Sequence, residues 1–157
     1  MKNLVARTIT GVLFVAAVVV SFLDPVAMTA LFALVTGLTV WEFTGLVNER
    51  NGVSVNRFIT TVAATYFYFA MAGFSSGITP PTAFIPYVLT IVYLMVAELY
   101  AKHEDPINCW AYTMLAQLYI ALPLSLLNVL AFRMTEGGMS FTSVLPLSVF
   151  VFLWVND

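Results

Sequence analysis

Long apolar stretches, separated by short polar turns, follow one another along this chain. Five of them cover residues 8–23, 25–47, 57–74, 84–101 and 107–132. Each is continuously apolar rather than alternating between apolar and polar positions. Most of them approach the ~20 residues that a helix needs to cross the hydrocarbon of a bilayer. The pattern therefore predicts membrane-spanning helices rather than the strands of a barrel.

A sixth apolar stretch runs over the 15 residues from Phe141 to Val155, and Asn156 and Asp157 follow it. Because it is shorter than a full crossing, we expect one of two arrangements. Either the helix continues past Asp157, or it crosses part of the membrane and presents Asn156 and Asp157 in a polar cavity. The prediction is an all-α, polytopic membrane protein with about six segments, the last of them truncated. Residues 1–157 would form a single transmembrane helical domain, the N-terminal portion of a longer membrane protein.

Local signals indicate where the helices begin, bend and end. Asp24 is placed to cap the helix that begins at Pro25, and proline suits a first helical turn. Pro123 is expected to kink the fifth segment. Gly73 and Gly77 have the spacing of a helix-packing motif, but they lie beside two serines at the end of a segment. We therefore interpret them as part of a turn.

Composition supports the same class of protein. Hydrophobic residues make up 61% of the chain and charged residues 9%, against roughly 45–50% and about 25% in soluble domains. The formal net charge of −2 argues against nucleic acid as a partner. With Cys109 as its single cysteine the chain cannot form an internal disulfide, and with His103 as its single histidine it shows no Cys/His cluster. We therefore expect no zinc site built from this segment.

Basic residues predict the orientation. If six segments cross the membrane, one side holds five of the six basic residues, namely Lys2, Arg7, Arg50, Arg57 and Lys102, and Arg133 is left on the other. Because Lys and Arg concentrate in cytoplasmic loops, the N-terminus is expected in the cytoplasm. Asn156 and Asp157 would then face the cytoplasm from a multi-pass protein of the inner (plasma) membrane.

Few polar residues lie within the segments, and most have a structural interpretation. Glu42 lies near the end of the second segment, close enough to the boundary to reach water or pair with Arg50. Glu98 lies four residues before Lys102, the favourable order for a helical ion pair.

Three further polar side chains have equally ordinary interpretations. His103 is expected to be solvated in a polar turn, and Gln117 and Asn128 to hydrogen-bond between helices. Asp157 is the exception, because a carboxylate at the membrane boundary is costly without a role. No nucleotide-binding loop, no Ser/His/Asp set and no Cys/His set accompanies it.

Three short blocks resemble one family. They are residues 2–11 (KNLVARTITG), residues 41–46 (WEFTGL) and residues 152–157 (FLWVND). The first resembles the basic N-terminus of the bacterial phosphatidate cytidylyltransferases, or CDP-diacylglycerol synthases, and the second resembles their aromatic–Glu block. The third resembles the entry to their catalytic region. The later signatures of that family do not occur within these residues.

The resemblance implies the reaction of CTP with phosphatidate, which gives CDP-diacylglycerol and diphosphate, and a requirement for Mg²⁺. Asp157 is then a candidate metal ligand, with Asn156 as a supporting candidate, and this segment alone is expected to be inactive. Membrane lipid is the implied surrounding, and a homo-oligomer is possible. A non-catalytic membrane module, a transporter subunit and a CTP-using lipid kinase stay open as alternatives.

Overall fold

A computed structural model of the chain describes the backbone of residues 2–156 and the side chains of residues 7–156. The helices are α1 (Lys2–Ser21), α2 (Pro25–Val47), α3 (Arg57–Ser75), the 3₁₀ turn η1 (Pro81–Phe84), α4 (Ile85–Ala101), α5 (Pro106–Leu115), the π-helical segment η2 (Ala116–Ala121), α6 (Leu122–Ala131) and α7 (Val144–Asn156). Two strands, β1 (Phe132–Thr135) and β2 (Gly138–Phe141), precede α7. The fold is mostly helical, as the sequence predicts.

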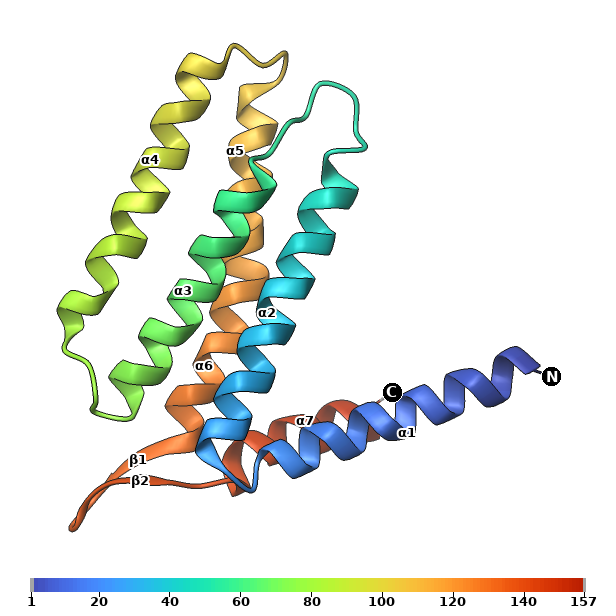
Figure 1. Cartoon of the computed structure of the whole chain (residues 1–157), viewed down its shortest axis with the longest axis vertical. Coiled ribbons are helices and arrows are strands. Elements are labelled where there is room, and N and C mark those ends of the chain that lie inside the picture. The colour runs from blue at the N-terminus through green and yellow to red at the C-terminus, as the bar shows by residue number, and fades with distance from the viewer. Residues whose placement is uncertain (1, 157) are drawn as a thin grey trace.

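Four stretches of the described chain are long and apolar enough to cross a membrane: Pro25–Val47, Arg57–Ser75, Pro81–Ala101 and Pro106–Ala131. They form an up-and-down bundle in which α2 and α3 make the most extensive pairing and α6 packs against α3 (Figure 1). The turns at residues 48–56 and 102–105 lie together at one end, which we call the polar end. The turn at 76–80 and the β-hairpin lie at the opposite end.

Helices α1 and α7 leave the opposite end of the bundle and run across its long axis (Figure 1). Within the residues whose side chains are described, their apolar stretches, Arg7–Ser21 and Val144–Asn156, are shorter than the four candidate spans. They are joined by an aromatic cluster in which the ring centroids of Phe22, Phe32 and Phe150 lie 5.4–5.8 Å apart, and Trp154 lies 5.9 Å from Phe150. The cluster therefore connects the first, second and last helices of the chain. The structure supports four crossings, and a count of six stays a prediction.

The bundle interior is built from small and hydroxyl-bearing residues, which let helices approach closely in lipid. Ala64, Ala116 and Ala121 are fully buried. Thr36 and Thr44, also fully buried, donate their hydroxyl hydrogens to carbonyl oxygens one turn earlier, at 2.7 Å. Their polar atoms are thus satisfied inside a single helix, so they can lie in the core without a partner from another helix.

The fifth predicted segment is one long helix with a local irregularity. Residues 116–121 take π-helical geometry directly before Pro123, which occupies the first turn of α6. Because proline lacks an N–H and its ring collides with the preceding turn, an inserted π turn accommodates it without ending the helix. Pro123 does mark the irregular region, as predicted, and the adjustment lies on its N-terminal side.

The hairpin is a departure from the all-α prediction. The sequence indicates a turn at residues 135–138 between two helices, whereas the structure has an antiparallel pair on each side of it, with Phe132 opposite Phe141. Their rings meet edge to face at 5.5 Å, and Gly138 has φ +111°, which other residues rarely adopt. A purely hydropathic interpretation assigns both phenylalanines to helices, which is why the strands were missed.

The helix ends lie where the sequence predicts caps and turns. The Asp24 carboxylate accepts a hydrogen bond from the Ala27 N–H at 2.8 Å at the start of α2. Gly77 has φ +75°, and the Gly73 carbonyl accepts from the N–H groups of Ile78 and Thr79. The interpretation as a turn is therefore confirmed for Gly77, whereas Gly73 lies in the last turn of α3 and its carbonyl closes the chain reversal.

Candidate functional site

The predicted metal pair lies at the end of α7. Asn156 is the last residue of this helix and its side chain is exposed. Asp157, the candidate ligand, lies outside the described residues. Its role as a ligand therefore stays a prediction.

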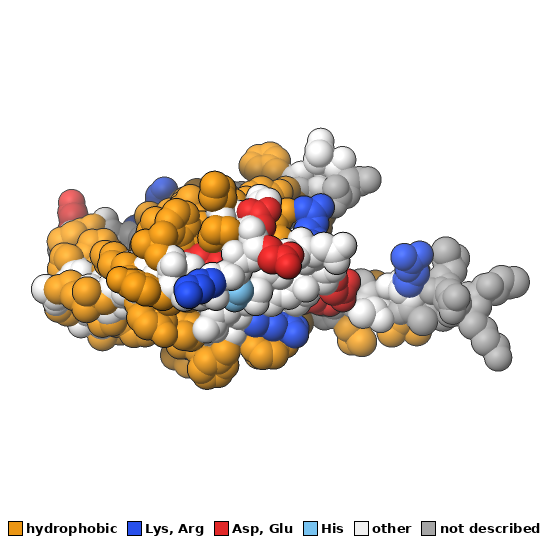
Figure 2. All heavy atoms as spheres, turned by 90° about the horizontal axis from the view of Figure 1, so that it is seen from above, with side chains coloured by type: hydrophobic (Ala, Val, Ile, Leu, Met, Phe, Trp, Pro, Cys, Tyr) orange, Lys and Arg blue, Asp and Glu red, His pale blue; other side chains and the backbone are white. Residues whose placement is uncertain are grey.

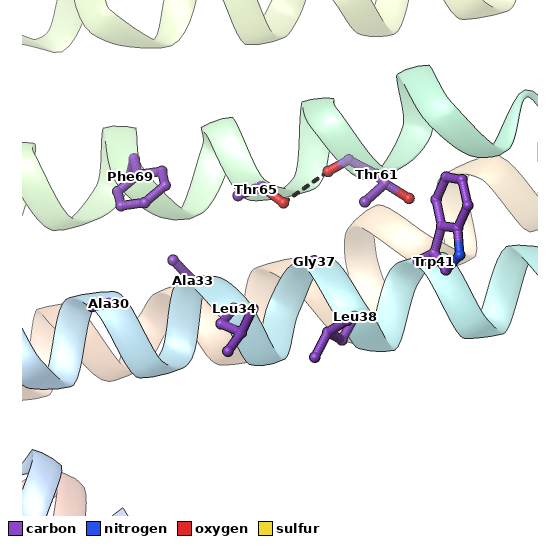
Figure 3. A pocket seen from close by; sticks show the side chains of 9 residues that line it. All are labelled: Ala30, Ala33, Leu34, Gly37, Leu38, Trp41, Thr61, Thr65 and Phe69. Atoms are coloured by element: carbon purple, nitrogen blue, oxygen red, sulfur yellow. Dashed lines mark hydrogen bonds between the residues drawn. The ribbon is translucent and has the colours of Figure 1, made fainter.

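A groove runs between α2 and α3 and encloses about 590 Å³. We call it the α2–α3 groove, and it is lined by Ala30, Ala33, Leu34, Gly37, Leu38, Trp41, Thr61, Thr65 and Phe69. The Trp41 ring stands at one end of it and Phe69 near the other (Figure 3). Thr65 donates its hydroxyl hydrogen to the Thr61 carbonyl at 2.9 Å, so this polar group is satisfied within α3. The surface that remains is almost wholly apolar.

Arg57 lies at the Trp41 end of the groove. Its guanidinium carbon is 4.0 Å from the centroid of the Trp41 ring, and its Nε–H donates to the Trp41 carbonyl at 2.7 Å. Gly45, one turn further along α2, leaves room for this group, because a Cβ there would lie 2.9 Å from the guanidinium. The glycine and the indole together fix a cation beside an apolar groove.

The charge of Arg57 is not neutralised locally. Among the side chains that the structure describes, no carboxylate lies within ion-pair distance of it. Arg50 is also at the polar end, but it hydrogen-bonds the Tyr112 hydroxyl and lies 5.5 Å from that ring. Of the two arrangements predicted for Glu42, the structure has the one that reaches water, because Glu42 is exposed and Arg50 contacts Tyr112 instead.

A second apolar cavity, of about 520 Å³, lies on the same side of the bundle toward the opposite end. Val26, Gly73 and Ile78 line it, and Ala30 and Phe69 line both cavities. Phe69 therefore stands where the two cavities meet.

Charged side chains gather at the polar end, where they are surrounded by hydrophobic ones (Figure 2). Glu98 and His103 pair there, with 2.7 Å between Oε1 and Nδ1. The predicted ion pair of Glu98 with Lys102 is wrong, and His103, whose side chain is 32% exposed, is only partly solvated. Lys102 has φ 51° and ends α4, so the continuous helix that an i, i+4 pair needs is not present.

Cys109 completes a cluster with Glu98 and His103, whose potential ligand atoms lie within 4.8 Å of one another. Its sulfur accepts the Ser54 N–H at 3.2 Å, and a cavity of about 230 Å³ adjoins the group. Nitrogen and thiolate donors suit Zn²⁺ better than Mg²⁺. The expectation that no Cys/His cluster exists is thus corrected, because folding brings His103 of the turn at 102–105 together with Glu98 before it and Cys109 after it.

The side-chain amides of Gln117 and Asn128 are both buried, and they make different hydrogen bonds. The Gln117 amide donates to the Thr60 carbonyl of α3 at 2.9 Å, so the predicted bond between helices is confirmed. The Asn128 amide donates to Ser125 within its own helix, at 3.1 Å. The Asn128 side chain also interacts with Tyr68 of α3, so its predicted contact between helices is not contradicted by the bond to Ser125.

Sequence analysis noted Trp41 only as part of the aromatic–Glu block at residues 41–46 and missed its pairing with Arg57. The available signal was Gly45 one turn after Trp41, since a glycine and an indole on one helical face leave space for a long side chain. Comparison with known proteins adds no relative: no family model, no curated protein and no solved structure matches this chain. The functional argument therefore depends on the residues themselves.

Proposed function

We propose that this chain is the N-terminal membrane part of a phosphatidate cytidylyltransferase, which forms CDP-diacylglycerol and diphosphate from CTP and phosphatidate. One observation carries the proposal. Trp154, in the block that resembles the entry to the family's catalytic region, packs against Phe150 in the aromatic cluster of α1, α2 and α7. Its helix is therefore anchored, while Asn156 at the helix end stays exposed. An anchored helix with a free polar end suits a site that the remainder of an enzyme completes.

The reaction joins two polyanions. An oxygen of the phosphatidate phosphate attacks the α-phosphorus of CTP, and the bond from that phosphorus to the diphosphate leaving group breaks. Mg²⁺ supplies the charge neutralisation that such a transfer requires. The carboxylate of Asp157 and the amide oxygen of Asn156 are oxygen donors of the kind this ion prefers. In this proposal Asp157 binds the ion and Asn156 supports it from the exposed end of α7.

We further propose that α1 and α7 cross the membrane as a pair in the intact protein, which gives six crossings. The N-terminus, the polar end of the bundle and residues 156–157 would then face the cytoplasm of a cell with an inner membrane. Arg50, Arg57 and Lys102 lie at the polar end and Arg133 at the opposite end, which supports this orientation.

The test is CMP transfer by the full-length protein in lipid nanodiscs. Radiolabelled CTP, phosphatidate and Mg²⁺ should yield labelled CDP-diacylglycerol, and Asp157→Ala should reduce the rate by at least ~100-fold, as expected for loss of a metal ligand. Glu136→Ala, a carboxylate in the exposed hairpin turn, is the matched control. A phosphorylated lipid without CMP would identify a CTP-using lipid kinase instead. Full activity of Asp157→Ala would remove this residue from the site.

A second candidate is a non-catalytic membrane module that assembles with a copy of itself or with another protein. The observation that favours it is α4, which is described throughout and buries Leu94 alone. Leu89, Val96 and Tyr100 on this helix are at least 46% exposed, so α4 packs less than the other spans. If the full-length protein transfers no CMP but purifies as a defined oligomer that Val96→Arg disrupts, this candidate replaces the enzyme.

A further inference from the structure

We propose that the α2–α3 groove binds one acyl chain of an anionic glycerophospholipid, with the phosphate of that lipid on Arg57. The lipid comes from the bilayer leaflet at the polar end. This inference goes beyond the cytidylyltransferase proposal, because it holds for an anionic lipid that is not a substrate.

The groove has the form that an acyl chain needs. It is lined by apolar and small side chains, with Gly37 so close to α3 that a Cβ there would lie 3.0 Å from the Thr65 hydroxyl. The two lining threonines are hydrogen-bonded within α3, so they present little polarity. A flexible hydrocarbon chain fills an irregular apolar groove without leaving polar groups unsatisfied.

The length of the groove matches one leaflet. Ala30 and Trp41 are 11 positions apart on α2, which corresponds to about 16 Å along a helix. Half of a hydrocarbon core of ~30 Å is about 15 Å. A chain whose glycerol lies beside Trp41 would therefore end near Phe69, at the middle of the membrane.

The charge at the groove mouth complements a phosphate. Arg57 uses its Nε–H on the Trp41 carbonyl, and none of its terminal N–H groups has a hydrogen-bond partner among the described residues. Trp41 is 42% exposed and carries the guanidinium on its ring, which keeps the cation at the level of lipid headgroups. A planar guanidinium with free terminal donors suits bidentate contact with a phosphate.

Photolabelling of the full-length protein in phosphatidylcholine nanodiscs tests the proposal. The probe is phosphatidylglycerol with a diazirine on its acyl chain, and the same label on phosphatidylcholine is the neutral control. The anionic probe should label peptides from residues 30–41 and 61–69 more strongly than the neutral probe does. Phosphatidylglycerol is not a substrate of cytidylyl transfer, so absence of that activity leaves this result unaffected.

Two variants and one matched control identify the site. Arg57→Gln should lower labelling by the anionic probe about fivefold, the effect of one basic residue near an anionic surface. Ala30→Phe should lower it by filling the exposed inner end of the groove, without touching Arg57. Arg50→Gln removes the same charge at the same end of the bundle and should leave labelling unchanged.

Three results would overturn the proposal. One is equal labelling by the anionic and neutral probes, and a second is labelling that neither Arg57→Gln nor Ala30→Phe lowers. The third is an efficient disulfide between Leu38→Cys and a cysteine in another segment or a second copy, which would show that protein fills the groove. Size-exclusion profiles of the variants confirm that each is folded before it is labelled.

Discussion

The guanidinium of Arg57 lies 4.0 Å from the centre of the Trp41 ring, and its Nε–H donates to the carbonyl of the same tryptophan. The two residues belong to neighbouring antiparallel helices and are brought together by the turn at residues 48–56. Trp41 thus supplies both a π face and a backbone acceptor. The Arg57 guanidinium therefore has a fixed position at the end of the α2–α3 groove.

We predict that Gly45 controls the position of the Arg57 guanidinium on the Trp41 ring. In Gly45→Val the new side chain would begin 2.9 Å from the guanidinium, and Arg57 would have to move off the ring. We expect labelling by anionic phosphatidylglycerol to fall about as far as in Arg57→Gln, roughly fivefold. Gly11→Ala is the control, because a Cβ at Gly11 meets nothing within 4 Å. Unchanged labelling in Gly45→Val would show that Arg57 acts without this contact.

Phe22 should hold the last helix to the rest of the chain. Its side chain is fully buried and contacts Phe32 of α2 and Phe150 of α7. Phe22→Ala should lower the free energy of unfolding by about 3–5 kcal/mol, the usual result of removing a buried aromatic ring. Leu23→Ala, at a side chain 75% exposed, should change it by less than about 0.5 kcal/mol. Denaturation in mixed micelles measures the free energy of unfolding of both variants. Equal losses in the two would contradict a stabilising role for the aromatic cluster.

The Gln117 hydrogen bond should contribute little to stability. Its amide reaches the Thr60 carbonyl, but its own carbonyl oxygen has no partner among the described atoms. Gln117→Leu removes both groups at similar volume, so we expect a change of less than about 1 kcal/mol. Ala116→Leu, one residue earlier and fully buried, should cost about 1–3 kcal/mol through overpacking. A larger loss for Gln117→Leu would indicate that the amide has a further partner.

Cysteine labelling distinguishes six crossings from four. In a Cys109→Ser background, a membrane-impermeant maleimide should reach Asn51→Cys and Asn156→Cys from the cytoplasm, and Glu136→Cys from outside. This outcome follows if α1 and α7 cross as a pair. Labelling of Asn156→Cys from the same side as Glu136→Cys would place α7 along the outer surface and leave no crossing pair. It would also move the proposed metal site out of reach of cytoplasmic CTP.

Hydropathy and capping predicted the four long helices closely, because each is a long apolar run bounded by a polar break. The sequence places the second helix at residues 25–47, and α2 has these bounds, fixed by Asp24 and Pro25. The direction of α1 and α7 was not predictable in this way, because apolar content does not determine the angle between helices. That angle depends on the contacts of Phe22 with Phe32 and Phe150.

Side-chain partners at the polar end were predicted less well. Spacing along one helix suggested that Glu98 pairs with Lys102, but the left-handed backbone of Lys102 ends α4 and His103 pairs with the carboxylate. The position of Arg57 against Trp41 depends on how α2 and α3 pack, and Gly45 marks the space beside the indole without indicating which side chain fills it. The metal pair proposed from the sequence, Asn156 and Asp157, stays a prediction.

Phe69 lies between the two apolar cavities on the α2–α3 side of the bundle and lines both of them. Chains that enter from opposite leaflets would meet tip to tip at this ring. A lipid headgroup that moved between leaflets along α2 and α3 would have to cross the apolar lining around Phe69. It would find no hydrogen-bond partner there, and its desolvation would be most costly at that depth. If the α2–α3 groove binds an acyl chain as proposed, this face holds lipids of the two leaflets apart and offers their headgroups no polar route for exchange.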